Sequence, residues 1–484
     1  MSTDQSAAAT PRDQPQSAAV PLEPDAARVF ADFAAALDFD RIPTPVVECT
    51  KKLIIDQLGV MLVGAAAAGV PELVASVREW GGAREASVIG HGFKAPAPLA
   101  ALVNGTMARA QDYDALHERA IVHITAGCLP QCLAIAERRG RVTGKEFITA
   151  MVAGMEFMIR LGISFETSFL HTGRVTTLHQ ATFGGALAGA KLLNLDRRQI
   201  VSALGLAYSQ VAGNLQVTVE GTVLVRVLQG FAAQAAVQSA LFAERGLVGP
   251  ERVLQGEFGY FKTYHENRYD AEILTRDLGK HFELPDVSIK FYPCCFLSHF
   301  AIDAMLQLVR SEGLRANDVV AIAVRVTQGT YNVVCAPEAA KRKPETMEEA
   351  LFSLQYTVAA ALVHGRFGLE QMTLRAIRDP AVRFVAQRIS TAVDAELERQ
   401  HGRAIGPSIV EVTCKDGRRL SCRVDFCKGH PKNPMNFDDC AQKFRSCAAF
   451  AAKPLAAEVV EAVIDQVRNL EDLADISRFV ALLA

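Results

Sequence analysis

The chain has 484 residues, 50% of them hydrophobic, and a formal net charge of -2. This length can bury a large core and predicts two domains. The near-neutral charge excludes the long-range positive field that binding to nucleic acid or to an anionic membrane requires, so any anionic partner must be small and held by local charges.

Residues 1–24 are rich in Ala, Pro, Ser and Gln and offer little that could anchor them to a core, which predicts a disordered tail. They lack the basic start and continuous apolar run of a secretory signal, and later apolar stretches are interrupted before they reach membrane-spanning length. We therefore expect a soluble, cytoplasmic protein without a membrane partner. Because the eleven cysteines are an odd number and no export signal is present, they predict free thiols rather than disulfides or metal clusters.

From Ala26 to about Tyr264 the apolar residues recur at every third and fourth position, which is the spacing of one helix face. Val47, Leu53 and Leu58 belong to one such stripe. The segments are rich in Ala and Gly, which suits close helix packing, and Asp196 is an expected N-cap. These features predict a helical domain over residues 25–266.

The pattern changes after residue 267, where a smaller α/β domain is expected. Residues 318–329 show the β-branched alternation of a strand and have helical segments on both sides. We assign residues 267–406 to this domain.

A hairpin is predicted next, with strands over 409–414 and 419–425 around the turn residues 415–417. Residues 454–470 then predict a helix that begins at Pro454 and carries an apolar face of Leu455, Val459, Val463 and Val467. We expect residues 407–484 to return to the helical domain.

The densest polar cluster follows a predicted helix and contains Asp112, Asp114, His117, Glu118 and His123. Carboxylates and imidazoles near a helix end can form a general acid and base, because imidazole titrates near neutrality and a neighbouring carboxylate tunes it. A solvated loop with helix caps explains the composition about as well. A metal site is less favoured, because the six-residue step between the two histidines matches no familiar ligand spacing.

Two other segments contain candidate residues for anion binding. His179 precedes a helix of small residues, whose N-terminus favours an anion, although a lone histidine there is more often structural. Lys290 lies in KFYPCC at an expected strand-to-helix junction, and it could neutralise a carboxylate or act as an acid. Cys295 and His299 follow it as candidate substrate contacts, and for the thiol a packing role is the better explanation.

Two polar residues lie in apolar helical stretches. Arg226 implies an anionic partner and Tyr356 implies a hydrogen bond, because buried polar groups are rarely left unpaired. Both could be purely structural.

In this order, the segments resemble the MmgE/PrpD family, which includes 2-methylcitrate dehydratases, cis-aconitate decarboxylases and iminodisuccinate epimerases. The resemblance spans nearly the whole chain and rests on LIIDQLGVMLVGA, NGTMARAQDYDALH, LHQATFGGALAGAKLLNLD, GLVGPERVLQGEFGYF, KFYPCC, FSLQY and NPMNFDDCAQKF. It implies a mainly α fold, with a large all-helical domain formed from both ends of the chain and a smaller α/β lid inserted between them. It also implies a homodimer with the active site in the cleft between the domains.

The resemblance further implies a small polycarboxylate substrate and no cofactor or metal. The residues that it places at the catalytic site are Asp112, His117, His123, His179, Lys290 and Tyr356, and Arg226 is a candidate carboxylate contact. In our hypothesis Lys290, Arg226 and a protonated histidine bind the carboxylates, while Asp112 orients a histidine. His123 or His179 removes the proton at the alpha carbon, and Tyr356 or the second histidine protonates the leaving hydroxyl.

Dehydration is the expected reaction, and epimerisation of a dicarboxylate or decarboxylation are the alternatives. A catalytically silent paralogue that binds a small acid is the non-enzymatic alternative. Ala115 and Leu116 stand where the family often has Asp and Thr, Ile124 and Thr125 replace Pro-Ser, and Val225 replaces a lysine. A tricarboxylate needs several positive contacts to offset desolvation, so the lost cation favours a different or smaller acid than 2-methylcitrate or cis-aconitate.

Overall fold

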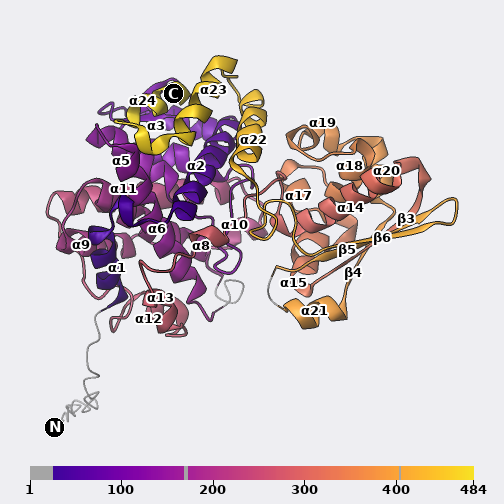
Figure 1. Ribbon diagram of the computed structural model, residues 1–484, viewed down its shortest axis with the longest axis horizontal. Coiled ribbons are helices and arrows are strands. Elements are labelled where there is room, and N and C mark those ends of the chain that lie inside the picture. Colours follow the sequence, from indigo (N-terminus) through magenta and orange to yellow (C-terminus); the bar gives the residue numbers. More distant parts are fainter. Residues whose placement is uncertain (1–24, 168–172, 403–404) are drawn as a thin grey trace, which may run out of the picture.

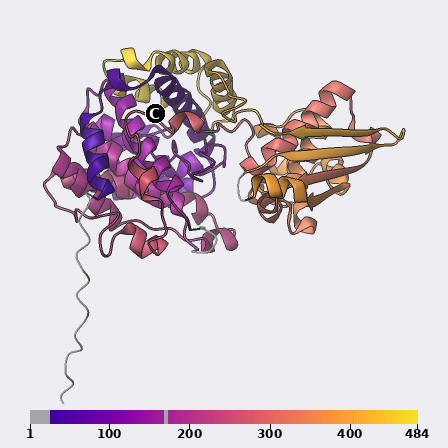
Figure 2. The ribbon, with the colours of Figure 1, turned by 60° about the horizontal axis from the view of Figure 1, so that its bottom comes forward.

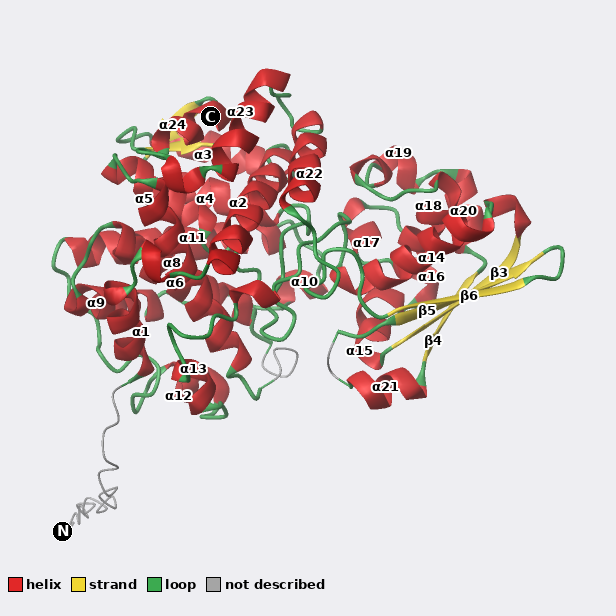
Figure 3. Ribbon diagram, in the orientation of Figure 1, coloured by secondary structure: helices red, strands yellow, loops and turns green. Residues whose placement is uncertain are grey.

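The computed structural model describes residues 25–167, 173–402 and 405–484, which form two lobes that lie side by side (Figures 1 and 2). The larger lobe is helical and holds both ends of the described chain, and the smaller lobe holds a four-stranded sheet (Figure 3). The mainly helical prediction with an inserted α/β part is therefore confirmed. The predicted tail over residues 1–24 lies outside the described residues. Within the described ranges, no helix is both long and apolar enough to cross a membrane.

The larger lobe is a helical bundle. Its N-terminal part extends from the first described residues to the end of α13. Its elements are α1 (Ala26–Ala36), α2 (Thr44–Gly64), α3 (Val70–Trp80), β1 (Ala86–Val88), β2 (Phe93–Ala95), α4 (Ala97–Arg109), α5 (Leu129–Arg139), α6 (Gly144–Ile163), α8 (Thr176–Leu192), α9 (Arg197–Tyr208), α10 (Gln216–Val219), α11 (Leu224–Glu244), α12 (Tyr260–His265) and α13 (Ala271–Thr275). Asp196 caps α9 by accepting from the Gln199 amide, as predicted.

Small residues set the close packing of this bundle. α11 packs against α4, α8 and α9. A Cβ atom added to Gly105 of α4 would lie 2.8 Å from Ala233 Cβ, and one added to Gly230 of α11 would lie 2.3 Å from the Leu102 carbonyl oxygen. Larger side chains at these two glycines would force the helices apart, which accounts for the Ala-rich and Gly-rich sequence.

The smaller lobe is built on a sheet of strand order β4-β3-β5-β6. β3 pairs with β4 in parallel, and the β3–β5 and β5–β6 pairs are antiparallel. α14 packs against β5, β6 and α18. The elements are α14 (His299–Glu312), β3 (Val319–Val326), α15 (Gln328–Thr330), α16 (Glu338–Lys341), α17 (Met347–Leu351), α18 (Leu354–His364), α19 (Leu374–Ile377), α20 (Pro380–Ala386), β4 (Ile389–Val393), α21 (Ala395–His401), β5 (Ser408–Cys414) and β6 (Arg419–Val424).

The chain then returns to the larger lobe, where the yellow C-terminal helices of Figure 1 lie among the indigo and magenta ones. These helices are α22 (Phe437–Ala449), α23 (Ala457–Arg468) and α24 (Ser477–Val480). α2 packs against both α22 and α23, so the two ends of the described chain share one core.

The structure moves the predicted domain boundaries. The hairpin of β5 and β6 exists as predicted, but it pairs with β3 in the smaller lobe, so the return begins after β6 and not at residue 407. Apolar residues from Leu274 to Ile289 pack in the core of the larger lobe, and the smaller core begins at Tyr292, apart from Leu116 of the loop after α4, which joins it. The smaller core therefore runs over residues 292–427 and not 267–406.

Two local predictions were also wrong. α23 begins at Ala457, because the preceding Ala456 has an extended backbone with φ -61° and ψ 146°, so Pro454 lies outside the helix. The KFYPCC segment follows no strand and is an irregular connection into α14. A proline and two bulky aromatic neighbours did not distinguish a strand end from such a connection.

Candidate active site

Buried charges gather where the loop after α4 meets the connection into the smaller lobe. Arg109, the last residue of α4, places Nη1 2.9 Å from Asp112 Oδ1 and 2.7 Å from Asp114 Oδ1. Lys290 Nζ donates to Asp112 Oδ1 over 2.9 Å and to the Asp112 carbonyl oxygen over 2.8 Å. Asp112 has a φ of 46°, a conformation that few non-glycine residues adopt and that is common at functional sites. The loop is thus held by two cations and two carboxylates.

His123 is bound to this network through one ring nitrogen. Its Nδ1 lies 2.9 Å from Asp114 Oδ2 and 3.1 Å from Arg109 Nη1. The two hydrogens of Arg109 Nη1 are used by Asp112 and Asp114, so we assign a hydrogen to Nδ1 of His123, which donates it to Asp114. Nε2 of His123 then carries a lone pair and is free to accept a proton.

The charges of the network are fixed by its burial and by its close pairs. Burial alone would raise the pKa of Asp114, but the charge of Arg109 and the hydrogen bond from His123 outweigh burial and hold this pKa well below its ordinary value. Asp112 behaves in the same way, with Lys290 and Arg109 opposing burial. Burial, followed by the charge of Arg109, lowers the pKa of His123. Two ionised carboxylates and a neutral imidazole result at neutral pH.

A second buried pair supports the network from α22. Lys443 Nζ lies 2.6 Å from Asp56 Oδ1 and donates to the carbonyl oxygens of Tyr113 and Lys290 over 2.8 and 2.7 Å. The same ammonium lies 3.6 Å from the centroid of the Tyr113 ring. Lys443 therefore connects the loop after α4 to the segment that carries Lys290.

His179 lies near this loop but has its own partners. The prediction that His179 precedes the helix was wrong, because His179 lies in the first turn of α8. Thr177 of the same turn accepts the His123 amide over 3.2 Å, so α8 starts against the loop. Nδ1 of His179 lies 3.1 Å from the Tyr260 hydroxyl, and burial lowers the pKa of His179 to about 3.

The remaining predicted residues are spread over separate places. His117 accepts the Ala120 amide at Nδ1 over 3.1 Å, and burial lowers its pKa to about 4. Arg226 of α11 forms an ion pair with Glu348 of α17, which joins the two lobes. His299 Nε2 donates to the Cys294 carbonyl oxygen over 3.3 Å, and Cys295 is a buried thiol whose pKa burial raises to about 11.

Tyr356 lies in the core of the smaller lobe. Its hydroxyl donates to the Gln371 carbonyl oxygen, and burial raises its pKa. Of the nine predicted side chains, the structure joins Asp112 to Lys290 directly and links His123 to them through Arg109.

Sequence reasoning missed the partners that complete the network. Asp112 was expected to orient a histidine, but Asp114 holds His123 while Asp112 holds Lys290. Arg109 and Lys443 were not singled out, although both lie in the quoted motifs NGTMARAQDYDALH and NPMNFDDCAQKF. Arg109 ends an apolar helix, which was an available signal, whereas Lys443 lies among other charged and polar residues of α22 and does not stand out.

Ten of the eleven cysteines are buried, and Cys422 is partly exposed. All eleven cysteines are free, as predicted. In the described part of the chain, no group of three or more His, Cys, Asp or Glu side chains is arranged to hold a metal ion.

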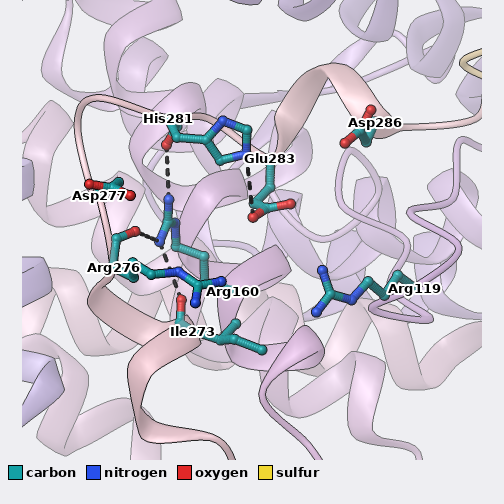
Figure 4. Close-up of a pocket in the computed structure, with 8 residues that line it drawn as sticks. All are labelled: Arg119, Arg160, Ile273, Arg276, Asp277, His281, Glu283 and Asp286. Carbon is teal, nitrogen blue, oxygen red and sulfur yellow. Dashed lines mark hydrogen bonds and ion pairs between the residues drawn. The ribbon is translucent and has the colours of Figure 1, made fainter.

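A polar cavity of about 400 Å³ lies elsewhere in the larger lobe (Figure 4). Arg160 points its guanidinium at the carbonyl oxygens of Ile273, Arg276 and His281 over 2.7 to 3.2 Å. None of the predicted site residues lines this cavity. Its lining holds three arginines and three carboxylates, in the set Arg119, Arg160, Ile273, Arg276, Asp277, His281, Glu283 and Asp286. We assign no catalytic role to it.

Comparison with known proteins shows the family of the chain. The family model for the MmgE/PrpD N-terminal domain matches residues 28–272, and that for the MmgE/PrpD C-terminal domain matches residues 292–469. The cis-aconitate decarboxylase-like protein oryM of Aspergillus oryzae is 28% identical over 92% of this chain and 94% of its own length. The cis-aconitate decarboxylase of Aspergillus terreus is 28% identical over 93% and 94%.

A third relative has a different activity in its name. The 2-methylcitrate dehydratase of Cupriavidus necator is 25% identical over 69% of this chain and 70% of its own length. The two family models together cover most of the sequence from residue 28 to residue 469. The chain belongs to the MmgE/PrpD family.

Proposed function

We propose that the chain is a lyase that acts next to a carboxylate of a small di- or tricarboxylic acid. The observation that carries this proposal is the pairing of His123 with Asp114, which leaves Nε2 of a neutral imidazole as a base beside Lys290. Proton abstraction at a carbon next to a carboxylate builds negative charge, and positioned cations stabilise that charge.

In the proposed reaction His123 Nε2 removes the proton at the alpha carbon, and Asp114 stabilises the imidazolium that forms. Lys290 and Arg109 are the cations beside the reacting carboxylate. The earlier expectation of a protonated histidine as a carboxylate ligand does not fit, because burial lowers the pKa values of His117, His123 and His179. Carboxylate binding therefore falls to the lysine and the arginines.

Dehydration is the reaction that this base supports best. The leaving hydroxyl needs an acid, and Tyr356 is poorly suited, because its hydroxyl is bound to a carbonyl oxygen within the smaller core. This leaves the second histidine, His179, as the acid. Decarboxylation is the second candidate, since the Aspergillus relatives named for it align over more than nine tenths of both chains. Both reactions pass through a carbanion next to a carboxylate.

The test is proton NMR of the purified, chelator-treated enzyme in heavy water with 2-methylcitrate, citrate, cis-aconitate and iminodisuccinate. Loss of water or of carbon dioxide from one acid would identify the reaction. Deuterium incorporation without a new product would favour the epimerase alternative. If every acid is unchanged, the lyase proposal loses its support and the silent paralogue takes its place.

The same assay tests the role of the base. His123→Gln is expected to lower turnover by about 10²- to 10⁴-fold, which is the usual contribution of a general base. His364→Gln is a matched control, because His364 is an exposed residue at the end of α18. Full turnover by the His123 variant would remove this residue from the mechanism.

A homodimer and a cytoplasmic location remain proposals that rest on the resemblance. Light scattering coupled to size exclusion should give about twice the 52.3 kDa chain mass if the protein is a dimer. A mass of one chain at micromolar concentration would contradict the dimer.

A further inference from the structure

A hydrogen-bonded chain of buried side chains leads away from His179. The Tyr260 hydroxyl lies 3.1 Å from Nδ1 of His179 and 3.2 Å from Nε2 of His265. The Thr167 hydroxyl lies 2.5 Å from Nδ1 of His265. Neither His265 nor Tyr260 is among the predicted site residues, and both lie in α12, far along the chain from α8.

Aromatic packing holds this hydrogen-bonded chain in place. His265 stacks on Phe165 with ring centroids 4.0 Å apart, and Tyr260 stacks on Tyr264 at 5.2 Å. Tyr264 also meets the His179 ring edge-on at 4.9 Å. His179, Tyr260 and His265 are each at most 1% exposed, so these groups have little competition from water.

Counting hydrogens restricts the directions of these bonds. Tyr260 has one hydroxyl hydrogen, so it donates to one imidazole and accepts from the other. Burial lowers the pKa of His179 to about 3 and that of His265 to about 4, so both rings are neutral at pH 7. Two arrangements remain, one in which Tyr260 donates to His179 and one in which it accepts from His179.

We infer that Tyr260 and His265 are positioning residues that hold His179 as the tautomer with its hydrogen on Nε2. In this arrangement Thr167 donates to His265, His265 donates to Tyr260, and Tyr260 donates to Nδ1 of His179. Nε2–H of His179 is then a neutral acid. The inference rests on the proposed function, in which an acid must complement the base at His123.

The two catalytic histidines therefore have opposite partners at Nδ1. Asp114 can only accept, so it fixes the hydrogen of His123 on Nδ1 and leaves Nε2 as a base. In the inferred arrangement Tyr260 donates, which keeps the lone pair of His179 on Nδ1 and leaves Nε2–H as an acid. Environments that separate two titratable groups in this way are how one site supplies both an acid and a base at neutral pH.

The kinetic test compares Tyr260→Phe with Tyr264→Phe in the full-length enzyme, using the acid that the panel identifies. Tyr260→Phe is expected to lower kcat by about 10- to 100-fold with KM within about threefold, since it disturbs an acid without removing it. Tyr264→Phe keeps the ring that packs on His179 and is expected to keep wild-type kcat. Equal kcat for wild type and Tyr260→Phe would overturn the inference.

A double-mutant cycle separates positioning from general stability. If Tyr260 acts through His179, adding Tyr260→Phe to His179→Ala should change kcat by less than about twofold, because the residue it positions is already absent. A further 10-fold loss in that background, or a loss of kcat explained by unfolding in a thermal melt, would contradict the inference.

Nitrogen-15 NMR of histidine-labelled enzyme tests the tautomer without any substrate. The His179 signals, identified by their loss in His179→Gln, are expected to show hydrogen on Nε2 in wild type and a mixture of tautomers in Tyr260→Phe. Hydrogen on Nδ1 in wild type would overturn the inference even if the enzyme is active. If the whole panel is left unchanged while His179 shows the expected tautomer, the proposed function fails and the positioning remains.

Discussion

At the scale of single residues, the position of one hydrogen on His123 decides its role. Asp114→Asn gives Nδ1 a partner that can donate as well as accept, so the favoured tautomer is lost. We expect kcat to fall by about 10²- to 10⁴-fold in this variant, as when a histidine-orienting carboxylate is removed. Asp112→Asn keeps the His123–Asp114 hydrogen bond, so its kcat should fall less than that of Asp114→Asn. Near wild-type kcat for Asp114→Asn at pH 7 would contradict the assignment.

A second residue-scale prediction concerns Glu118. Burial raises the pKa of Glu118 to about 7 and a bond from Ser288 opposes the shift, whereas the unfolded chain has the ordinary value near 4.5. The folded state therefore binds more protons between about pH 4.5 and 7, and the free energy of unfolding falls as the pH rises through that window. His430 Nε2 is 3.7 Å away, but burial lowers its pKa, so it offers little positive charge there.

Glu118→Gln should remove this pH dependence, because the amide does not titrate. Its free energy of unfolding at pH 8 should exceed that of wild type by about 1–2 kcal/mol, after a discount for the exposed part of the side chain. Urea denaturation at pH 5 and pH 8 measures the difference. A parallel pH dependence in both proteins would show that Glu118 has an ordinary pKa.

The sequence revealed which residue types carry the chemistry but not how they pair. Asp112 and His123 stand out because they lie in the densest polar cluster of the sequence, and Lys290 stands out at an expected strand-to-helix junction. Their partners depend on tertiary contacts, since Lys290 meets Asp112 across 178 positions and His179 meets Tyr260 across 81. No short-range pattern in the sequence predicts a contact between residues that are so far apart along the chain.

At the scale of elements, Lys443 of α22 holds α2, the loop after α4 and the segment that carries Lys290 through its buried ion pair and two hydrogen bonds. Lys443→Met leaves the Asp56 carboxylate and two carbonyl oxygens without their buried partner. We expect a loss of about 3–5 kcal/mol in the free energy of unfolding, as for other broken buried pairs. Lys443→Met combined with Asp56→Leu should recover part of the loss, because no uncompensated charge remains. A loss below 1 kcal/mol for the single variant would mean that the pair contributes little.

Elements were predictable where their signal is local. The apolar period over residues 47–62 predicts a helix and lies within α2, and Asp196 caps α9 because a cap needs only three neighbouring residues. The hairpin was also found, yet its lobe was not, because its partner β3 ends 82 residues before β5 begins. Pro454 suits a first helical turn or an extended lead-in equally well, and only the packing of α23 decides between them.

At the scale of the whole molecule, few polar contacts between the described residues join the two lobes away from the connecting segments. The Arg226–Glu348 pair links α11 of the larger lobe to α17 of the smaller one. Arg226 is buried, while the Glu348 side chain is 41% exposed, so the carboxylate can leave at modest cost. If Arg226 binds a substrate carboxylate, Glu348 competes with that carboxylate for the guanidinium.

Glu348→Gln should therefore lower KM by about twofold to fivefold, since an ion pair of this exposure contributes up to about 1 kcal/mol. The value of kcat should not change, because the variant leaves the His123 network intact. Glu349→Gln is the matched control, since it removes one negative charge at the adjacent residue. Glutamine can still accept and return the hydrogen bonds of the α17 capping box at this position. A raised KM for Glu348→Gln alone would instead show that the pair holds the lobes in the binding arrangement, and Arg226 would then have a structural role.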